Sequence, residues 1–425
     1  EAFIFNQALM HASYPNQSNQ SRLAVTVGVV PEKAKMSMLY YDNDRKKVSR
    51  YSMPDDMFLH YPQIIKSPKI GAFEEEFDYV VPEINEQVLK DHLYQNRIKF
   101  ATMKPLFNDA KNQELFEKNG FLKIPAINEE DIQALLDLLE ELNFNRANGH
   151  GFYVGMDHKD KKAVSYMMDR VAEIVLPKVA PYLVDYRLIT ASFVIKDPNP
   201  VGIVPPHQDW TFVEDEVQHC SVTCWIPLQK TTMENGCLGV IKGSNQYFSS
   251  VRPSPSPQSP SPLSKHMFTL FPYLNLIEME AGEALIFDNR TIHASPPNIS
   301  NEPRLAVGLS FTQKEAELRH YYLKPGTKDT LIKYKIDPAF FKKYDNASLS
   351  KMYDANQCID DYEVISEQPF LWDDLSKKQF EERMLASGNQ YNKALASHMK
   401  KLFGQQMKTG IINKVKSLVR KVIPI

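Results

Sequence analysis

Two side chains with metal-binding atoms stand two residues apart in the segment Pro-Pro-His-Gln-Asp-Trp, at 205–210. On an extended strand His207 and Asp209 leave the same face, because successive side chains alternate between faces. A neutral imidazole and a carboxylate placed in this way can fill two adjacent corners of an octahedral metal. A histidine from another strand would complete a facial triad with three open positions. His293, shortly after the strand-like segment 283–289, is the candidate.

The His-X-Asp motif is short, and about one chance occurrence is expected in a chain of this composition. A second one, His158 to Asp160, lies in a highly charged stretch that leads into a predicted helix, and we interpret it as solvated surface. The prediction of a metal site at His207 and Asp209 therefore depends on the other residues that accompany the first motif.

Arg304 follows His293 by eleven residues, on the strand-like segment 304–311. An inward guanidinium is costly to bury unless it meets a carboxylate, and a dicarboxylic ligand would supply one. Ser295 could add a hydroxyl to the same carboxylate. The alternatives are a core histidine with satisfied hydrogen bonds and an arginine on an exposed strand edge. The order of these residues and their strand contexts favour a binding site.

The elements that must position these residues are helices first and short strands afterwards. A strand is predicted at 121–124, followed by a helix that begins after the N-cap Asn128 and has acidic residues in its first turn. A second helix is predicted from 161 to 176, ending at Pro177. Short strands separated by Gly, Pro and Asn follow. This order predicts an α+β chain built around an antiparallel barrel or jelly roll.

One segment occurs twice. Residues 1–25 match 283–307 without a gap at more than half of their positions, so that His11, Ser13 and Arg22 correspond to His293, Ser295 and Arg304. A repeat this long is a duplicated domain rather than a solenoid. We therefore expect a C-terminal remnant of a first, truncated copy at 1–98 and a complete domain at 99–395. His11, Ser13 and Arg22 have no metal partner in this chain, so we do not count them as a working site.

Composition limits the partners and the compartment. The 425 residues carry a net charge of −2, so a nucleic-acid partner is not indicated. No apolar run of about 18 residues predicts a transmembrane helix. The four cysteines, at 220, 224, 237 and 358, form no Cys-X-X-Cys pair, which is typical of reduced thiols in a cytoplasmic protein. The oligomeric state stays open.

Two further segments have distinct compositions. Alternating Ser and Pro at 252–265 predict an exposed, extended loop. Residues 396–425 predict a basic amphipathic helix with an apolar face from Ile411 to Val422. Such a helix can lie on an anionic membrane surface, but we favour docking on its own domain or on a subunit.

The motif set resembles the phytanoyl-CoA dioxygenase family. It comprises His-Gln-Asp at 207–209, Trp225, the segment 235–245, His-Ala-Ser at 293–295, and Arg304, within a resemblance over roughly Leu115 to Tyr322. Lys242 departs from the family, which more often has proline there. The departure falls in a turn and leaves the metal ligands unaffected.

The resemblance implies a double-stranded β-helix, a cupin-like jelly roll, with flanking helices. It implies that His207, Asp209 and His293 hold Fe(II), and that Arg304 and Ser295 hold the 5-carboxylate of 2-oxoglutarate. Gln208 and Trp225 would line the cosubstrate pocket. Trp210 and Phe212 are either substrate wall or core.

The implied function is a dioxygenase that uses Fe(II), 2-oxoglutarate and O2 to hydroxylate a C–H bond of a small molecule or lipid-like acid, releasing succinate and CO2. The first copy would then belong to a tandem oxygenase. Two alternatives stay open: a non-catalytic dicarboxylate-binding or regulatory module on the same fold, and a cupin-like enzyme that uses another metal.

Overall fold

The computed structural model describes residues 37–42, 44–53, 71–78, 103–144, 146, 151–248 and 250–408. The chain divides into two units, Glu1–Leu89 and Lys90–Ile425. His11, Ser13 and Arg22 lie outside the described residues, as does the predicted apolar face from Ile411 to Val422. None of the described helices combines the length and the apolar character needed to cross a membrane.

The described part of the first unit is a small antiparallel sheet. Its strands pair in the order β1-β2-β3. Their bounds are Ser37–Asp42 for β1, Lys47–Ser52 for β2 and Phe73–Asp78 for β3. Val48 and Tyr51 of the middle strand are buried, and the Tyr51 ring meets Phe73 edge-on. The predicted domain boundary at 98/99 stays a prediction.

Two antiparallel sheets form the centre of the second unit. The larger has the order β4-β11-β8-β13-β6-β5, and the smaller has the order β10-β9-β12-β7. The larger consists of β4 Phe121–Pro125, β5 Phe152–Val154, β6 Tyr186–Lys196, β8 Val222–Pro227, β11 Glu283–Asp288 and β13 Arg304–Gln313. The smaller consists of β7 Val204–His207, β9 Leu238–Val240, β10 Asn275–Ile277 and β12 His293–Ser295. A third sheet contains β14 Arg319–Leu323, β15 Thr330–Lys335 and β16 Val364–Pro369.

Side chains of the large sheet alternate between its two faces. One face packs in a core that helices cover, and the other face lines a cavity. On β6, Ile189, Ala191, Phe193 and Ile195 belong to the main apolar core, together with residues of α5. Thr190, Ser192 and Val194 point the other way and line a cavity. A separate apolar cluster between the two sheets includes Trp225 and Leu285 from the large sheet and Leu238 and Val240 from the small one. The two sheets therefore pack face to face.

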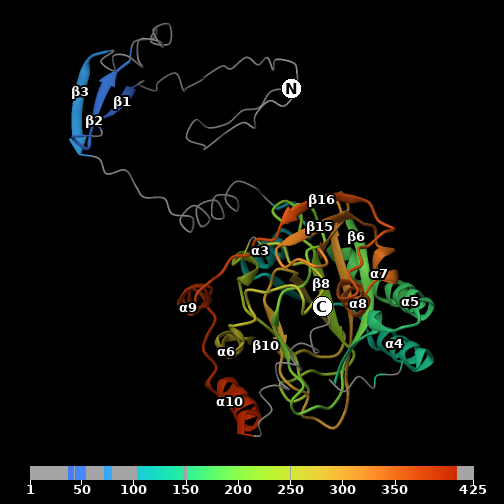
Figure 1. The fold of residues 1–425 in the computed structure, drawn as a ribbon. Helices are drawn as coiled ribbons and strands as arrows, with labels where there is room; N and C mark the ends of the chain where they lie inside the picture. The colour runs from blue at the N-terminus through green and yellow to red at the C-terminus, as the bar shows by residue number, and fades with distance from the viewer. Residues whose placement is uncertain are drawn as a thin grey trace. The chain divides into compact units, whose positions relative to one another are not determined.

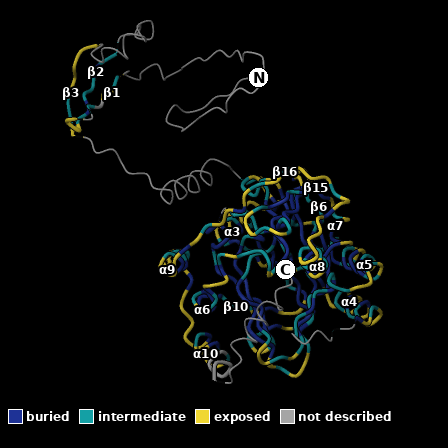
Figure 2. Tube along the Cα trace, in the orientation of Figure 1, coloured by how far each residue is buried: buried dark blue, intermediate teal, exposed yellow. Residues whose placement is uncertain are grey.

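Helices cover the outside of this core (Figure 1), and the strands between them are mostly buried (Figure 2). Figure 1 shows α4 and α5 next to each other at one side of the sheets, and α5 contacts both α4 and β6. The helices are α3 Ala110–Asn119, α4 Glu129–Leu142, α5 Lys161–Val179, α6 Met267–Leu270, α7 Phe340–Lys343, α8 Asn346–Asp354, α9 Lys377–Ala386 and α10 Lys393–Lys408. The mixed helix and sheet content confirms the predicted α+β class.

Two helix predictions have different outcomes. Asn128 caps α4 as predicted and forms a capping box with Asp131. The predicted stop at Pro177 is wrong, because α5 continues to Val179 with the proline inside it. Val175 and Val179 are fully buried on the two sides of the proline, and this packing offsets the hydrogen bond that the proline removes.

The Ser/Pro segment 252–265 is not exposed throughout, contrary to expectation. Ser254 is fully buried, because its backbone pairs with β14: its N–H donates to Tyr321 O and its carbonyl accepts from Leu323 N. Its hydroxyl also bonds to Nε2 of His320, at 2.7 Å. Long-range pairing thus anchors this segment, whereas Pro257 and Ser261 remain exposed.

Candidate metal centre

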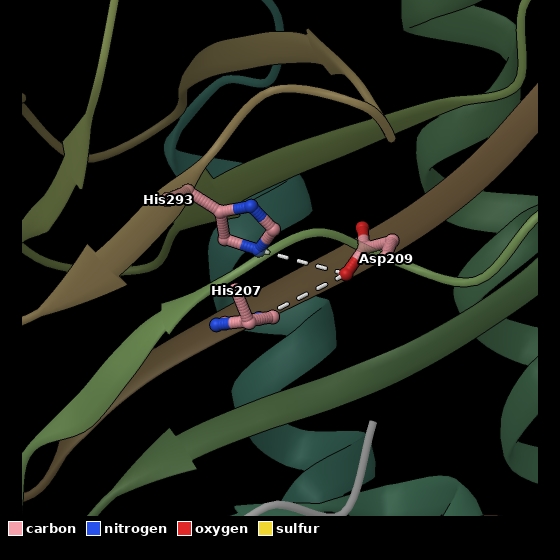
Figure 3. Close-up of side chains that lie close together, drawn as sticks. All are labelled: His207, Asp209 and His293. Carbon is pink, nitrogen blue, oxygen red and sulfur yellow. Dashed lines mark ion pairs between the residues drawn. The ribbon is translucent and has the colours of Figure 1, made fainter. Parts of the chain in front are cut away.

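His207, Asp209 and His293 come together, with one ligand atom of each within 4.8 Å of the others (Figure 3). His207 is the last residue of β7 and His293 the first of β12, and the two face each other across the antiparallel pair. Their ring centroids lie 4.0 Å apart. The strand β7 ends at His207. Asp209 therefore lies two residues beyond the strand, whereas the sequence predicts both residues on one strand. These three side chains can hold one metal ion from a single side.

Backbone hydrogen bonds orient both imidazoles. Nδ1 of His207 donates to the carbonyl oxygen of Pro205 at 2.7 Å, and Nδ1 of His293 donates to that of Thr291 at 2.9 Å. The proton therefore sits on Nδ1 in both rings, and the lone pair of each Nε2 is free. The two Nε2 atoms lie 3.9 Å and 3.5 Å from Oδ1 of Asp209. Such anchoring of the remote nitrogen is the usual arrangement for histidine ligands of metals.

The Asp209 carboxylate is held so that one oxygen remains for a metal. Its Oδ2 accepts a hydrogen bond from Thr223 Oγ1 at 2.8 Å, and its backbone N–H donates to the carbonyl of Asn289 at 2.9 Å. Oδ1 is left facing the histidines. Thr223 is therefore a positioning residue that the sequence did not reveal.

The charge state of His207 suits metal binding. Burial, followed by the adjacent His293, holds the pKa of His207 well below its usual range. The ring is therefore neutral at physiological pH, and a neutral imidazole is the form that donates a lone pair to a metal.

A buried cation lies in the same cavity. Arg304 is 1% exposed, and its guanidinium stacks over Trp225 at 5.0 Å. One of its N–H groups donates to Gly236 O at 3.0 Å, whereas Nε and Nη2 have no hydrogen-bond partner among the described residues. Burial lowers the pKa of Arg304 to about 10, so it keeps its charge at neutral pH. Unused donors on a buried guanidinium are expensive and indicate a place for an anion.

A second buried basic side chain, Lys196, was not predicted from the sequence. It is also 1% exposed, and its Nζ donates to Ser295 Oγ at 2.9 Å. Burial and then the Arg304 charge hold the pKa of Lys196 well below its usual range. Neither Lys196 nor Arg304 forms an ion pair within the described part of the chain. The sequence did contain one indication: Lys196 is an even number of residues from Thr190 and Ser192 on β6, so its side chain leaves the same face of the strand as theirs.

Apart from Lys196, which is bonded to the lining residue Ser295, these groups line one cavity of about 190 Å³. Its walls include all three candidate metal ligands together with Trp225, Ser295 and Arg304. The structure thus brings together six of the seven residues named from the sequence. Trp210 and Phe212 line the cavity and also belong to the main core.

The seventh residue, Gln208, lies elsewhere. Its amide donates to the carbonyl oxygen of Arg290, and it lines a neighbouring cavity of about 490 Å³ beside the Ser/Pro segment. The second His-X-Asp motif is outside both cavities. Asp160 caps α5, and the His158 ring packs on Phe144 with their centroids 4.5 Å apart.

Two sequence comparisons find a similarity to the same family. Residues 116–306 match the model of the family described as Phytanoyl-CoA dioxygenase (PhyH). The phytanoyl-CoA dioxygenase of Arabidopsis thaliana is 29% identical over 140 residues, which are 30% of this chain and 45% of the relative. The phytanoyl-CoA dioxygenase domain-containing protein 1 of Danio rerio is 27% identical over 137 residues, 31% of this chain and 47% of the relative. The chain thus spans about half the length of the curated relatives it matches.

Solved structures with a detectable likeness are more distant. The non-heme alpha ketoglutarate dependent carbocyclase SnoK from nogalamycin biosynthesis is 17% identical with a TM-score of 0.38, over 52% of this chain and 92% of its own. HygX from Streptomyces hygroscopicus, with nickel and 2-oxoglutarate bound, is 15% identical with a TM-score of 0.36, over 48% and 86%. It is the sequence match that relates the site to a family: residues 116–306, which contain every candidate metal ligand, are similar to the phytanoyl-CoA dioxygenase family.

Proposed function

We propose that the second unit is an Fe(II)- and 2-oxoglutarate-dependent dioxygenase that hydroxylates a C–H bond of a small molecule or lipid-like acid. One observation carries the proposal: a single cavity is lined by a two-histidine, one-carboxylate group and by Arg304, a buried cation that has no carboxylate of its own among the described residues. Two histidines and a carboxylate with open positions are the ligand set of non-heme Fe(II) oxygenases.

The anion that fits between Arg304 and the candidate metal ligands is a dicarboxylate. The unused Nε and Nη2 of Arg304 can grip one carboxylate through two parallel hydrogen bonds. Ser295 and Lys196 are already bonded to each other beside it and can add a hydroxyl and a second positive charge. The other end of the ligand would reach the open positions at His207, Asp209 and His293.

When bound, iron and 2-oxoglutarate supply the oxidation: 2-oxoglutarate, O2 and R–H give succinate, CO2 and R–OH, with one oxygen atom in succinate and one in the alcohol. The chain's own part is to hold and orient. Asp209 is fixed by Thr223, and the histidines are fixed by their Nδ1–H bonds. The largely apolar walls, such as Phe152 and Phe212, exclude water from the reacting C–H bond.

We further propose that the two facing sheets form the double-stranded β-helix, a cupin-like jelly roll. The pairing of β12 between β9 and β7, opposite a sheet in which β8 lies between β11 and β13, supports this arrangement. A cytoplasmic location is also proposed. The support for it is that Cys220, Cys224 and Cys237 are buried free thiols.

The test is an anaerobic titration of the purified chain with Fe(II) and then 2-oxoglutarate, followed by the weak visible charge-transfer band of a chelated 2-oxo acid. We expect the band in the wild type, its loss in His207→Ala and its weakening in Arg304→Ala. His158→Ala, in the second His-X-Asp motif, is the matched control and should keep the band. A folded chain that binds iron but develops no band would overturn the proposal.

We also propose that the first unit is the C-terminal part of a preceding copy of the same domain. With the offset of 283 residues that relates Tyr51 to Tyr334, β2 falls on β15. Each is the middle strand of a three-stranded antiparallel sheet. The inward residues agree as well, since Val48 and Tyr51 are buried, and so are Leu331 and Tyr334.

A local irregularity supports the same relation. The pairing of β2 with β3 shifts register between Arg50 and Tyr51, and that of β15 with β16 shifts between Lys333 and Tyr334, the equivalent positions. Bulges tend to persist within a family. The natural transcript can be sequenced upstream of Glu1. We expect a His-X-Asp motif about 84 residues before His11, the spacing between Asp209 and His293. An upstream sequence without it would contradict the duplication.

A further inference from the structure

The cavity has a second charged region, of opposite sign to the first. Arg304 and Lys196 are register partners at one end of the β13–β6 pair. Four residues back along β6, on the order of 13 Å at the rise of a strand, Ser192 accepts the backbone N–H of Met156 at 3.1 Å. This bond anchors the 3₁₀ turn Gly155–Asp157, so Asp157 joins the cavity wall away from the cations.

The Asp157 carboxylate has no partner of its own. Within 103–144, 151–248 and 250–408, no group donates a hydrogen bond to it and no cation pairs with it. The nearby Lys161 is engaged by Asp345 and by the carbonyl of Met156. Asp345 also caps α8 through Ser348 N, at 2.7 Å. Two carboxylates that both line the cavity therefore share one lysine, and Asp157 is the one that lacks a bond to it.

The surroundings make this imbalance costly. Phe152, Val154 and Phe341 form apolar walls around the same cavity. A carboxylate among hydrocarbon groups is stabilised by a proton or by a cationic ligand. Burial and then Asp345, opposed by Lys161, raise the pKa of Asp157 to about 8, so without a ligand the group takes up a proton. At the other charged region, the unused donors of the fully buried Arg304 show independently that the cavity is built around a ligand.

We propose that the substrate is an amine with a hydrocarbon body, whose ammonium group binds Asp157 while a C–H bond of the body lies beside His207 and His293. The inference rests on the proposed function and narrows its substrate class. A ligand that ends in a carboxylate would leave Asp157 protonated and would bring a like charge to Asp345. An ammonium group takes the place of that proton and pairs with the ionised Asp157 carboxylate, and Phe152, Val154 and Phe341 cover the body.

The test measures binding to the full chain by calorimetry with three probes of one length: hexylamine, hexanol and hexanoate. We expect hexylamine to bind more tightly than hexanol, whereas hexanoate reports on the separate anion site at Arg304. Asp157→Asn should weaken hexylamine by about thirtyfold and leave hexanol unchanged, because it removes one partner of a desolvated charge pair. Asp360→Asn, which changes an exposed aspartate outside the cavity, is the matched control.

The selectivity of the wild-type chain keeps the inference testable if Asp157→Asn does not fold. Equal or weaker binding of hexylamine, relative to hexanol, would overturn it. So would a folded Asp157→Asn chain with unchanged hexylamine affinity. Because these probes are measured without iron or 2-oxoglutarate, the result is separate from the charge-transfer titration. An amine site without that band would retain the binding site and reject the oxygenase.

Discussion

Lys196 and Arg304 face each other across the β6–β13 pair, both almost completely buried and neither paired with a described carboxylate. Burial and the Arg304 charge disfavour the ammonium form of Lys196, and among the described residues both side chains bond only to neutral groups, Ser295 and Gly236. This arrangement is unfavourable in the empty chain and favourable once a dianion binds. The cavity is therefore preorganised for its ligand at some cost in stability.

Lys196→Met should separate these two effects. We expect the free energy of unfolding of the ligand-free chain to rise by about 1–3 kcal/mol, because a buried basic group without a carboxylate partner is replaced by an apolar chain of similar length. The affinity for 2-oxoglutarate should fall by at least about tenfold. Urea unfolding and anaerobic titration measure the two quantities. Lys335→Met, at an exposed lysine on β15, should change neither. A destabilised Lys196→Met with intact 2-oxoglutarate affinity would mean that Lys196 has only a structural role.

Thr223→Val tests the support of the candidate metal ligand Asp209. The substitution keeps the shape of the side chain but removes the hydrogen bond to Oδ2, so the carboxylate can rotate away from the histidines. We expect Fe(II) affinity to fall by about 10–100-fold, the usual effect of removing a group that orients a ligand. Competition with a metal chelator measures it. The matched control is Thr330→Val, whose hydroxyl bonds only to the exposed Asp329. Equal loss in both variants would exclude a specific role for Thr223.

The candidate ligands could be predicted because their geometry is local. His207 and Asp209 belong to one short segment, and Ser295 and Arg304 keep a fixed spacing from His293 along two consecutive strands. Lys196 could not be found in this way, because its partner Ser295 lies 99 residues away and only the sheet register joins them. Gln208 was assigned to the cosubstrate pocket from the resemblance alone, and its bond to Arg290 O carries it into the neighbouring cavity.

The fold shows the same division between local and long-range causes. The N-cap at Asn128 is a local signal, and the structure confirms this prediction. The continuation of α5 past Pro177 depends on core packing, and the burial of Ser254 depends on β14, so neither could be deduced from a window of sequence. The role of Asp157 could not be predicted either, because it depends on the cavity wall that Asp157 shares with Asp345, 188 residues later in the chain.

Acid should destabilise the chain through His320. Burial lowers the pKa of His320 to about 3, against about 6.5 for an exposed histidine. Between these values the unfolded chain binds a proton that the folded chain does not, so stability falls as the pH falls below 6.5. The expected slope is up to about 1.4 kcal/mol per pH unit for this group. Urea unfolding at pH 7, 6 and 5 measures it. His320→Gln should flatten this dependence, and an unchanged slope would assign the acid sensitivity to other groups.

Asn346→Ala should loosen the cavity wall next to the candidate amine site. Asn346 lines the cavity, and its amide bonds in both directions to the backbone of Ser256 in the Ser/Pro segment, at 2.8 Å each. Removing it leaves the half-buried N–H and carbonyl of Ser256 without these partners, which should lower the free energy of unfolding by about 1 kcal/mol. If the segment positions this wall, hexylamine affinity should fall as well.

The control for this prediction is Gln258→Ala in the same segment. The Gln258 amide bonds to Ser350 and Asp354 on α8, outside the cavity lining. It should therefore reduce stability without changing hexylamine affinity. Calorimetry of both folded variants decides between the two roles of the segment. If both lose affinity in proportion to their loss of stability, the segment only stabilises the domain. If Asn346→Ala alone loses affinity, the Ser/Pro segment positions the substrate through the residue beside Asp345.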